Sequence, residues 1–322
     1  MKWFLSRFLP FVLVAGFFPL AAFAQAYPTK PVKVIIVFPP GGSNDVTGRI
    51  VYQKMSELMG QQFVIENRGG AAGTIGSEVV ANSPNDGYTL MVQSATHIAN
   101  AHLYKKLPYD VLTDFIGITT LARQVGILVV HPQLPVKTVR DFITLAKKRP
   151  GELVYSSAGN GSYVHLAGAL FWSSAGIKLI HVPYKGGGPS TTALVSGESQ
   201  STIATIGSVY GHLKNKRVKP LGVTSDTRTT QFPDVPAIAE FLPGFEFTAW
   251  VGTFAPKGTP KPIIDQLNES LRKALADTGV AEKLKAQTLD PMPMTTEQFA
   301  ARLKSDYEKY QKVVKISGAR ID

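Results

Sequence analysis

The chain contains no cysteine among its 322 residues, and it lacks the short patterns that mark several enzyme classes. Without cysteine, disulfide bonds, thiolate metal sites and a cysteine nucleophile are excluded. The sequence has no G-x-x-x-x-G-K-[ST] loop and no G-x-G-x-x-G after a strand, the two signatures of nucleotide binding. A G-x-S-x-G nucleophile elbow is also missing. We therefore predict no catalytic residue and no cofactor.

Histidine is sparse, and its spacing gives no support for a metal site. None of the six histidines stands four residues from another, and H-E-x-x-H does not occur. A lone histidine more often belongs to a core or a surface than to a metal site. His97 and His165 nevertheless lie beside segments rich in small polar residues, so both are kept as candidates for ligand contact.

The first 24 residues have the pattern of a secretory signal peptide. A basic start precedes an apolar stretch from Phe8 to Ala22, and Ala22-Phe23-Ala24 has the small-x-small form that signal peptidase cuts. The apolar run is shorter than the ~20 residues that a spanning helix needs, and two prolines interrupt it. We expect cleavage near Ala24 and export to the periplasm.

Chain length and net charge narrow the number of domains and the kind of binding partner that we expect. Removal of residues 1–24 leaves 298 of the 322 residues, which suggests two domains. The formal charge is +11, from 34 basic and 23 acidic residues. The basic residues are dispersed, which argues against nucleic acid and favours a positive surface that attracts small anions. A merely solvated basic face is the alternative.

A strand–turn–helix rhythm runs through most of the chain. Val32 to Phe38 is an apolar, β-rich run that Pro39-Pro40-Gly41-Gly42 ends, and Asp45 to Met59 carries apolar residues at helical spacing. Such alternation predicts an α/β fold with parallel, doubly wound sheets. The tail differs, because it reads as three amphipathic helices: Pro262–Ala276, Val280–Ala286 and Thr295–Val314.

The order of these segments predicts two lobes joined by two crossings. The rhythm changes near residues 125–130 and returns near 247–254. We expect residues 25–127 plus 251–322 to form the first lobe and residues 128–250 to form the second. The C-terminal helices should then pack on the first lobe.

Two loops, one in each predicted lobe, have the form of an anion cradle. Pro39 to Asp45 joins a strand to a helix, and Ser156 to Ser162 has the same form. Ligands of open α/β sheets bind beyond the carboxyl ends of strands, where N–H groups at a helix start attract an anion. Ser43 or Asn44 could instead cap the helix in an ordinary turn. Lys185 to Ser190 is a third loop of this kind, and Trp250 and Tyr163 could pack on a ligand.

Several ordered segments resemble a known family. They are Tyr27-Pro28-Thr29-Lys30-Pro31-Val32, Pro40-Gly41-Gly42-Ser43-Asn44-Asp45, Val64-Ile65-Glu66-Asn67-Arg68-Gly69-Gly70-Ala71-Ala72-Gly73, Pro84-Asn85-Asp86-Gly87-Tyr88-Thr89-Leu90, Leu107-Pro108-Tyr109-Asp110, His181-Val182-Pro183-Tyr184-Lys185-Gly186 and Phe232-Pro233-Asp234-Val235-Pro236. Together they resemble the Bug family of TctC-like extracytoplasmic solute-binding proteins, the receptors of tripartite tricarboxylate transporters. The resemblance runs from about Tyr27 to the C-terminus.

The resemblance implies a periplasmic-binding-protein fold of type II-like, Venus flytrap form, in which each lobe is a mostly parallel sheet flanked by helices. It also implies a monomer that captures a small carboxylate and delivers it to membrane transporter subunits. Family members hold one carboxylate through the first-lobe loop, and the second-lobe loop meets the other end of the ligand. The candidate ligand-binding residues are Pro40, Gly41, Gly42, Ser43, Asn44, Ser94, Thr96, His97, Ser156, Ser157, Gly161, Ser162, His165, Thr205 and Trp250.

One stretch departs from the family pattern. Near Gln200 to Ser208 the family commonly has acidic or Asp-Asn positions, whereas this chain has Thr205 and no acid there. The difference favours a plain carboxylate over an amino acid and leaves di- or tricarboxylates and aromatic acids open. A periplasmic ligand sensor and a secreted two-lobed enzyme are the alternatives to a transport receptor.

Overall fold

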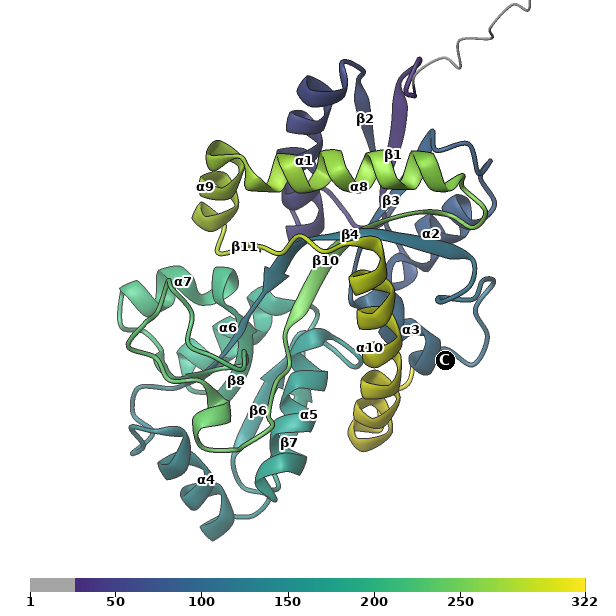
Figure 1. The fold of residues 1–322 in the computed structure, drawn as a ribbon. Helices are drawn as coiled ribbons and strands as arrows, with labels where there is room; N and C mark the ends of the chain where they lie inside the picture. Colours follow the sequence, from purple (N-terminus) through teal and green to yellow (C-terminus); the bar gives the residue numbers. More distant parts are fainter. Residues whose placement is uncertain (1–26, 322) are drawn as a thin grey trace, which may run out of the picture.

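The computed structural model describes residues 27–321, so the predicted signal peptide lies outside the described residues. Two β-sheets, each flanked by helices, form two lobes that lie one above the other in Figure 1. The first sheet has the order β11-β4-β10-β3-β1-β2. Its strands are β1 (Val32–Ile36), β2 (Phe63–Asn67), β3 (Thr89–Ser94), β4 (Phe115–Gln124), β10 (Ala249–Pro256) and β11 (Asp290–Pro291).

The second sheet has five strands in the order β7-β6-β8-β5-β9. They are β5 (Gly126–Val130), β6 (Val154–Ser157), β7 (Ile180–Pro183), β8 (Ser201–Thr205) and β9 (Lys219–Val223). The first lobe comprises the first sheet with its helices, and the second lobe comprises the second sheet with its helices.

Most strands within each sheet run the same way. In the first sheet β1 pairs in parallel with β2 and β3, while β10 is antiparallel to both β3 and β4. In the second sheet β6 is parallel to β7 and β8, while β5 is antiparallel to β8 and β9. The predicted α/β class with mostly parallel sheets is therefore confirmed.

The chain passes between the two sheets twice. The chain leaves the first sheet at the end of β4 and enters the second sheet at the start of β5, directly after Val125. The chain returns when β10 begins at Ala249. The two predicted crossings between the lobes correspond to the β4–β5 and β9–β10 connections. The exact residue limits of the lobes given above stay a prediction.

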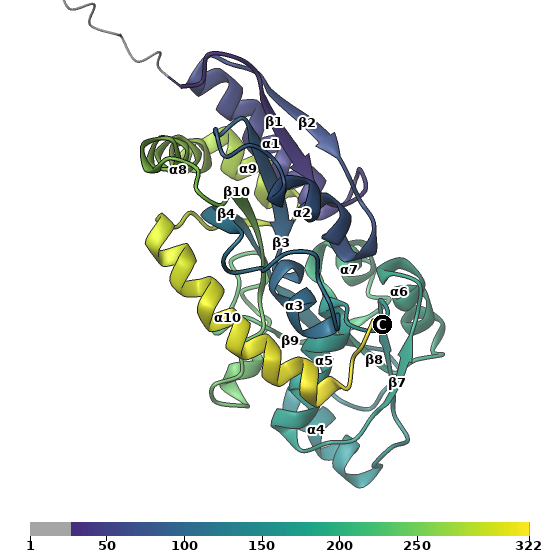
Figure 2. The same ribbon diagram turned by 90° about the vertical axis from the view of Figure 1, so that its right-hand side faces the viewer.

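Helices cover both sheets (Figures 1 and 2). Those of the first lobe are α1 (Ser43–Met59), α2 (Thr74–Ala81), α3 (Thr96–Leu103), α8 (Lys261–Ala276), α9 (Thr278–Ala286) and α10 (Thr296–Ser317). Those of the second are α4 (Val139–Lys148), α5 (Tyr163–Ala175), α6 (Gly187–Ser196) and α7 (Ile206–Lys214). Short 3₁₀ turns, η1 (Ala71–Gly73) and η2 (Ile238–Glu240), complete the elements. No helix within residues 27–321 is long and apolar enough to cross a bilayer.

The three C-terminal helices lie where the sequence predicted them, and one of them, α10, contacts both lobes. α8 and α9 pack on α1, as expected for the first lobe. α10 packs on β4 and α3 of the first lobe and also on α5 of the second (Figure 2). All three helices therefore pack on the first lobe as expected, and α10 in addition bridges to the second lobe.

The predicted loop at Lys185 to Ser190 is corrected by the structure. Its glycines open helix α6, which begins at Gly187 and packs on β6 and β8. Glycine has low helix propensity, so the local pattern gives no helical signal there. Burial of Ser190, Ala193 and Leu194 against the second sheet supplies the stabilisation that the local sequence lacks.

Candidate ligand-binding site

A cavity of about 360 Å³ lies between the two lobes. This volume is in the range of small-molecule sites, roughly 300–1,000 Å³. The walls come from the ends of β1 and β3, from the starts of α1, α3 and α5, from both crossing segments and from α10. The lining residues are Phe38, Pro39, Pro40, Gly42, Ser43, Asn44, Ser94, Ala95, Thr96, Ala99, Gln124, Gly161, Tyr163, Leu166, Ala249 and Tyr310.

None of the described residues that line the cavity carries a charged side chain. The N-termini of helices reach its wall instead, and their unpaired N–H groups carry partial positive charge. The start of α1 is open in this sense. Gly42 is the N-cap, and no side chain accepts a hydrogen bond from the first turn. The interpretation of Ser43 or Asn44 as the cap is therefore wrong.

The Asp45 carboxylate fixes the first-lobe loop through hydrogen bonds. Its Oδ2 accepts a hydrogen bond from the Gly41 N–H at 2.9 Å, and Arg49 Nε lies 3.0 Å from both carboxylate oxygens. Asn67 Nδ2 donates to Oδ1 at 2.8 Å. Burial raises the pKa of Asp45, but the bonds from Arg49, Gly41 and Asn67 outweigh it and lower that pKa overall. The carboxylate thus fixes the loop instead of capping the helix.

Asn44 supplies the most informative polar atom of the site. The residue is 4% exposed and lines the cavity. Its Nδ2 has no hydrogen-bond partner among the described residues. An unsatisfied buried donor costs about 1–3 kcal/mol, so such a group is usually paired in a working protein. The amide is thus an unused donor in a residue of the cavity wall.

The second-lobe loop meets the cavity only through Gly161. Ser162 caps α5 by accepting from His165 N at 3.2 Å, and its Oγ donates to Gly159 O at 2.7 Å. The Gly161 N–H donates to His165 Nδ1 at 3.1 Å. The predicted residues Ser162 and His165 therefore shape the loop and do not line the cavity.

Ser156 and Ser157 lie deeper in the second lobe. Both side chains are fully buried, and Ser156 Oγ donates to Ser190 O at 3.1 Å. Ser157 Oγ lies 2.6 Å from His181 Nε2, which is the serine–histidine pair that a hydrolase would need. Burial lowers the pKa of His181, and Ser157 does not line the cavity. This pair therefore gives a substrate no access to the serine, and it serves as a buried structural contact.

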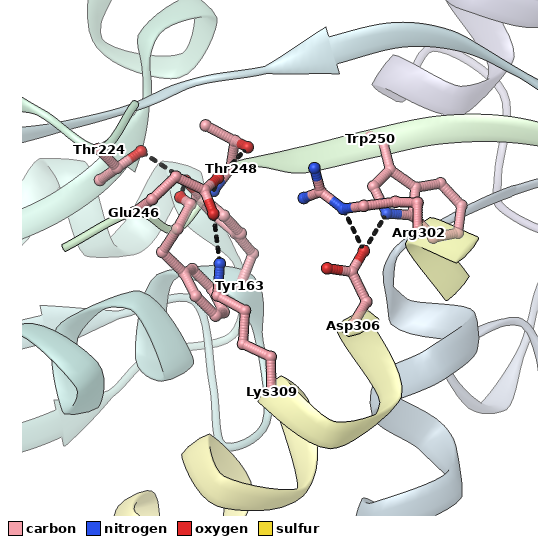
Figure 3. Close-up of polar contacts among 9 residues, drawn as sticks. Tyr163, Thr224, Glu246, Thr248, Trp250, Arg302, Asp306 and Lys309 are labelled. Atoms are coloured by element: carbon pink, nitrogen blue, oxygen red, sulfur yellow. Dashed lines mark hydrogen bonds and ion pairs between the residues drawn. The ribbon is translucent and has the colours of Figure 1, made fainter. Parts of the chain in front are cut away.

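Two aromatic candidates also lie behind the cavity wall. His97 is fully buried, with Nε2 at 3.0 Å from Val111 O and its ring against Phe115. Burial lowers its pKa to about 4, so the ring is neutral. Trp250 is 1% exposed and donates through Nε1 to Asp306 Oδ2 at 2.7 Å (Figure 3). Neither side chain lines the cavity.

Gly41 and Thr205 line a neighbouring cavity of about 420 Å³. The two cavities share Ser43 and Gln124, so they are adjacent parts of one interlobe region. Pro40, Gly42, Ser43, Asn44, Ser94, Thr96 and Gly161 are the predicted residues that the structure brings together around the first cavity. Pro39 of the predicted first-lobe loop and Ala95, between the predicted Ser94 and Thr96, also line it. The lining residues outside the predicted segments are Phe38, Ala99, Gln124, Leu166, Ala249 and Tyr310.

The crossing segment before β10 is anchored to both lobes (Figure 3). Tyr163 Oη donates to Phe247 O at 2.7 Å and lies 3.0 Å from Thr224 Oγ1, both on the second-lobe side. Glu246 forms an ion pair with Lys309 of α10. A cavity-lining tyrosine and the bridging helix therefore hold the same short segment.

Metal binding finds no support in this part of the chain. Residues 27–321 contain no group of three or more histidine and acidic side chains that could hold a metal ion. Small-molecule capture by neutral donors is the chemistry that the lining residues can perform.

Two α/β lobes, two crossings and an uncharged cavity between the lobes define a two-domain solute-binding protein. The sequence profile described as "Tripartite tricarboxylate transporter family receptor" matches residues 47–318. The chain belongs to this TctC family of receptors, which includes Bug proteins, as the ordered motifs predicted.

Curated relatives agree over most of the chain. A UPF0065 protein in the tcbD-tcbE intergenic region of Pseudomonas sp. (strain P51) is 39% identical over 292 residues, 90% of this chain and 87% of the relative. BugT of Bordetella pertussis is 34% identical and covers 92% of each chain.

Solved structures agree in fold. Rpa4515 of R. palustris, solved with adipate, has a TM-score of 0.79 at 33% identity and covers 92% of this chain and 100% of its own. MatC of Rhodopseudomonas palustris, with bound malate, has a TM-score of 0.74 at 31% identity and covers 89% and 100%. The family comprises solute-binding receptors.

Proposed function

We propose that this protein is a periplasmic receptor that binds a small carboxylate in the interlobe cavity and delivers it to a tripartite tricarboxylate-type membrane transporter. The observation that carries the proposal is the unpaired Nδ2 of Asn44, a residue at the uncapped start of α1 that lines an uncharged cavity. Adipate and malate in two related structures are small carboxylates as well.

The chemistry of this end of the cavity suits a carboxylate. A carboxylate oxygen accepts hydrogen bonds readily, and hydrogen bonds to a charged group are stronger than those between neutral groups. The start of α1 offers backbone N–H groups, and Asn44 and Ser43 add side-chain donors. Among the described residues no fixed cation lines the cavity, so the ligand is held by dipoles and can leave without breaking a salt bridge.

Export and delivery belong to the same proposal. Residues 1–24 have the pattern of a cleaved signal peptide, and related structures are described as periplasmic. Deletion of the gene should abolish uptake of the ligand and leave its enzymatic breakdown in cell extracts intact. Uptake that persists while induction of the uptake genes is lost would instead identify a sensor.

A thermal-shift screen of the ligand-stripped protein against a panel of carboxylates tests the binding step. A ligand at about 100 times its dissociation constant adds roughly 2.7 kcal/mol to the free energy of unfolding. We expect at least one carboxylate to raise the melting temperature by several degrees. A panel in which only uncharged or cationic solutes do so would overturn the proposal.

Asn44→Asp provides the matching test of the site. The substitution keeps the shape but replaces the donor with a carboxylate, so a bound carboxylate loses a hydrogen bond and meets a like charge. We expect the dissociation constant to rise about 100-fold, which corresponds to roughly 2.7 kcal/mol. Asn215→Asp makes the same charge change at an exposed position of the second lobe and should leave affinity unchanged. Similar affinities in the two variants would remove Asn44 from the site.

A further inference from the structure

We infer that the ligand has a single carboxylate, bound at the first-lobe end, and an apolar body that packs against the second lobe and α10. This inference rests on the proposed function, and it names a subclass of carboxylates. It separates this protein from the two related structures solved with the dicarboxylates adipate and malate. The two ends of the cavity differ in their supply of free hydrogen-bond donors, and this inequality carries the inference.

Three backbone N–H groups and one hydroxyl of the second-lobe loop are already used in hydrogen bonds within the protein. The N–H of Gly159 donates to Ser157 Oγ at 3.2 Å, and that of Gly161 donates to His165 Nδ1 at 3.1 Å. The N–H and Oγ of Ser162 both donate to Gly159 O, at 3.2 and 2.7 Å. The Ser162 side chain also accepts from His165 N at the start of α5, whereas α1 of the first lobe has no side-chain cap and has the unpaired Asn44 amide.

The wall around that end is largely apolar. It consists of the Tyr163 ring, Leu166 and Ala249, with Tyr310 from α10. The Tyr163 hydroxyl donates to Phe247 O, and its ring stacks on that of Phe247 with centroids 5.5 Å apart. This wall therefore offers the ligand ring and methyl surface, which favours an apolar body.

Charged side chains behind this wall are paired with one another and offer a second carboxylate no countercharge. Arg302 Nε of α10 pairs with Asp306 at 2.8 Å, and Lys309 of α10 pairs with Glu246 (Figure 3). Burial raises the pKa of Tyr163 and of Tyr310, so both hydroxyls are neutral.

A second carboxylate would have to be buried there without a countercharge. Tyr310 and Gln124 are the neutral polar side chains near this wall, and two such groups offset the desolvation of an ion less than the backbone and amide donors at the start of α1 do. The neighbouring cavity, lined by Thr205, Gln287 and Thr288 among others, is also free of charged lining residues in the part of the chain that the structure describes. Within residues 27–321, the linings of the two cavities therefore supply no countercharge for a second acid group.

Matched ligand pairs measured by isothermal titration at pH 7.5 test the inference. Hexanoate and adipate share a six-carbon chain, and benzoate and terephthalate share a ring, so each pair differs by one carboxylate. We expect the monoacid of the better-bound pair to bind at least tenfold more tightly than its diacid. A diacid that binds as tightly as its monoacid, or more tightly, would overturn the inference and leave the proposed carboxylate receptor intact. Failure of every monoacid and diacid in a wider panel would instead overturn the proposed function, and with it this inference.

Glu246→Gln tests the electrostatic step with its shape preserved. The variant leaves Lys309 without its ion-pair partner and so provides a countercharge for a second carboxylate, and the preference for hexanoate over adipate should therefore fall severalfold. Glu308→Gln makes the same change on an exposed position of α10 and should leave the preference unchanged. Melting temperatures of both variants show whether each is folded. A preference that stays the same in folded Glu246→Gln would contradict the inference.

Discussion

Gly161 connects the second-lobe loop, the cavity and the first lobe at a single residue. Its φ is +73°, in the left-handed region that side chains other than glycine rarely adopt. A Cβ at this position would lie 3.1 Å from Leu103 of α3, on the opposite lobe. The N–H group is committed to His165. A side chain here would therefore hold the lobes apart as well as strain the loop.

Gly161→Val should weaken ligand binding at least tenfold, as measured by titration with the best carboxylate of the screen. Gly176→Val is the matched control, because Gly176 has a φ of +61° with open space around its Cβ direction. Both variants should lose about 1–3 kcal/mol of stability from backbone strain. Only the first should lose affinity, and equal affinities would contradict a role for Gly161 at the interlobe contact.

The cavity-lining residues form two groups: those that the neighbouring sequence identifies and those that it does not. Pro40, Gly42, Ser43, Asn44 and Gly161 follow strands in the sequence, where open sheets place ligands, so pattern alone pointed to them. No comparable local signal identifies Phe38, Gln124, Leu166, Ala249 and Tyr310. These side chains reach the cavity because the crossings and α10 bring distant segments together. His97 and Trp250 are polar aromatics near the right segments, but their side chains turn into the core.

At the scale of elements, the segment before β10 is the joint on which both lobes depend. Its backbone follows β9 through a bond from Phe247 N to Thr224 O at 2.9 Å. Tyr163 Oη reaches the same two residues, and Thr224 Oγ1 also accepts from Gly126 N at 2.9 Å beside the other crossing. A single hydroxyl of α5 therefore links the two connections between the lobes.

Tyr163→Phe should lower the free energy of unfolding by about 1–3 kcal/mol, because it leaves Phe247 O without its buried donor. The ring that lines the cavity remains, so apolar contact with the ligand is retained. Urea unfolding measures the stability change. Tyr210→Phe is the control, because Tyr210 of α7 is 37% exposed. Its free energy of unfolding should fall by no more than about 0.5 kcal/mol. Equal losses in the two variants would show that the Tyr163 hydroxyl does not secure the crossing.

Helices with strong local signals were predictable, and those with weak signals were not. α4 has a Thr138 capping box and a pronounced apolar face, and α8, α9 and α10 have clear amphipathic spacing. α6 has a weak helical pattern, and α7 has no side-chain cap. Each contains two glycines, and both become helical because the second sheet buries one side of them. Tertiary packing supplied the helix stabilisation that local propensity did not provide.

Two buried histidines, one in each lobe, make the stability of the whole molecule depend on pH. Burial is the main cause that lowers the pKa of His97 and of His165 to about 4, from an unfolded value of about 6.5, and His181 lowers that of His165 further. Between these pH values the unfolded chain binds protons that the folded protein does not. The free energy of unfolding therefore falls as the pH falls from about 6.5 to about 4.

Thermal unfolding between pH 7 and pH 4.5 should show this loss as a steady fall in melting temperature. Each pKa unit corresponds to about 1.4 kcal/mol, so the effect of one histidine is measurable. His97→Gln should make the fall shallower, because its titration is removed. Asn215→Gln, at an exposed position of the second lobe, changes no titratable group, so it is the control and should keep the wild-type profile. A profile in His97→Gln as steep as that of the wild type would contradict this assignment.

The order of the segments along the chain by itself determined the class of this protein. Alternating strands and helices, two glycine-rich strand–helix turns and the ordered family motifs are local features, since each depends on neighbours within a few residues. The tertiary structure alone decided which side chains face the cavity, that α10 bridges the lobes and that the donors of the second-lobe loop are satisfied internally. The physical reason is that burial and hydrogen-bond satisfaction depend on segments far apart in the chain, such as Gly161 before α5 and Leu103 on α3, which only folding brings into contact.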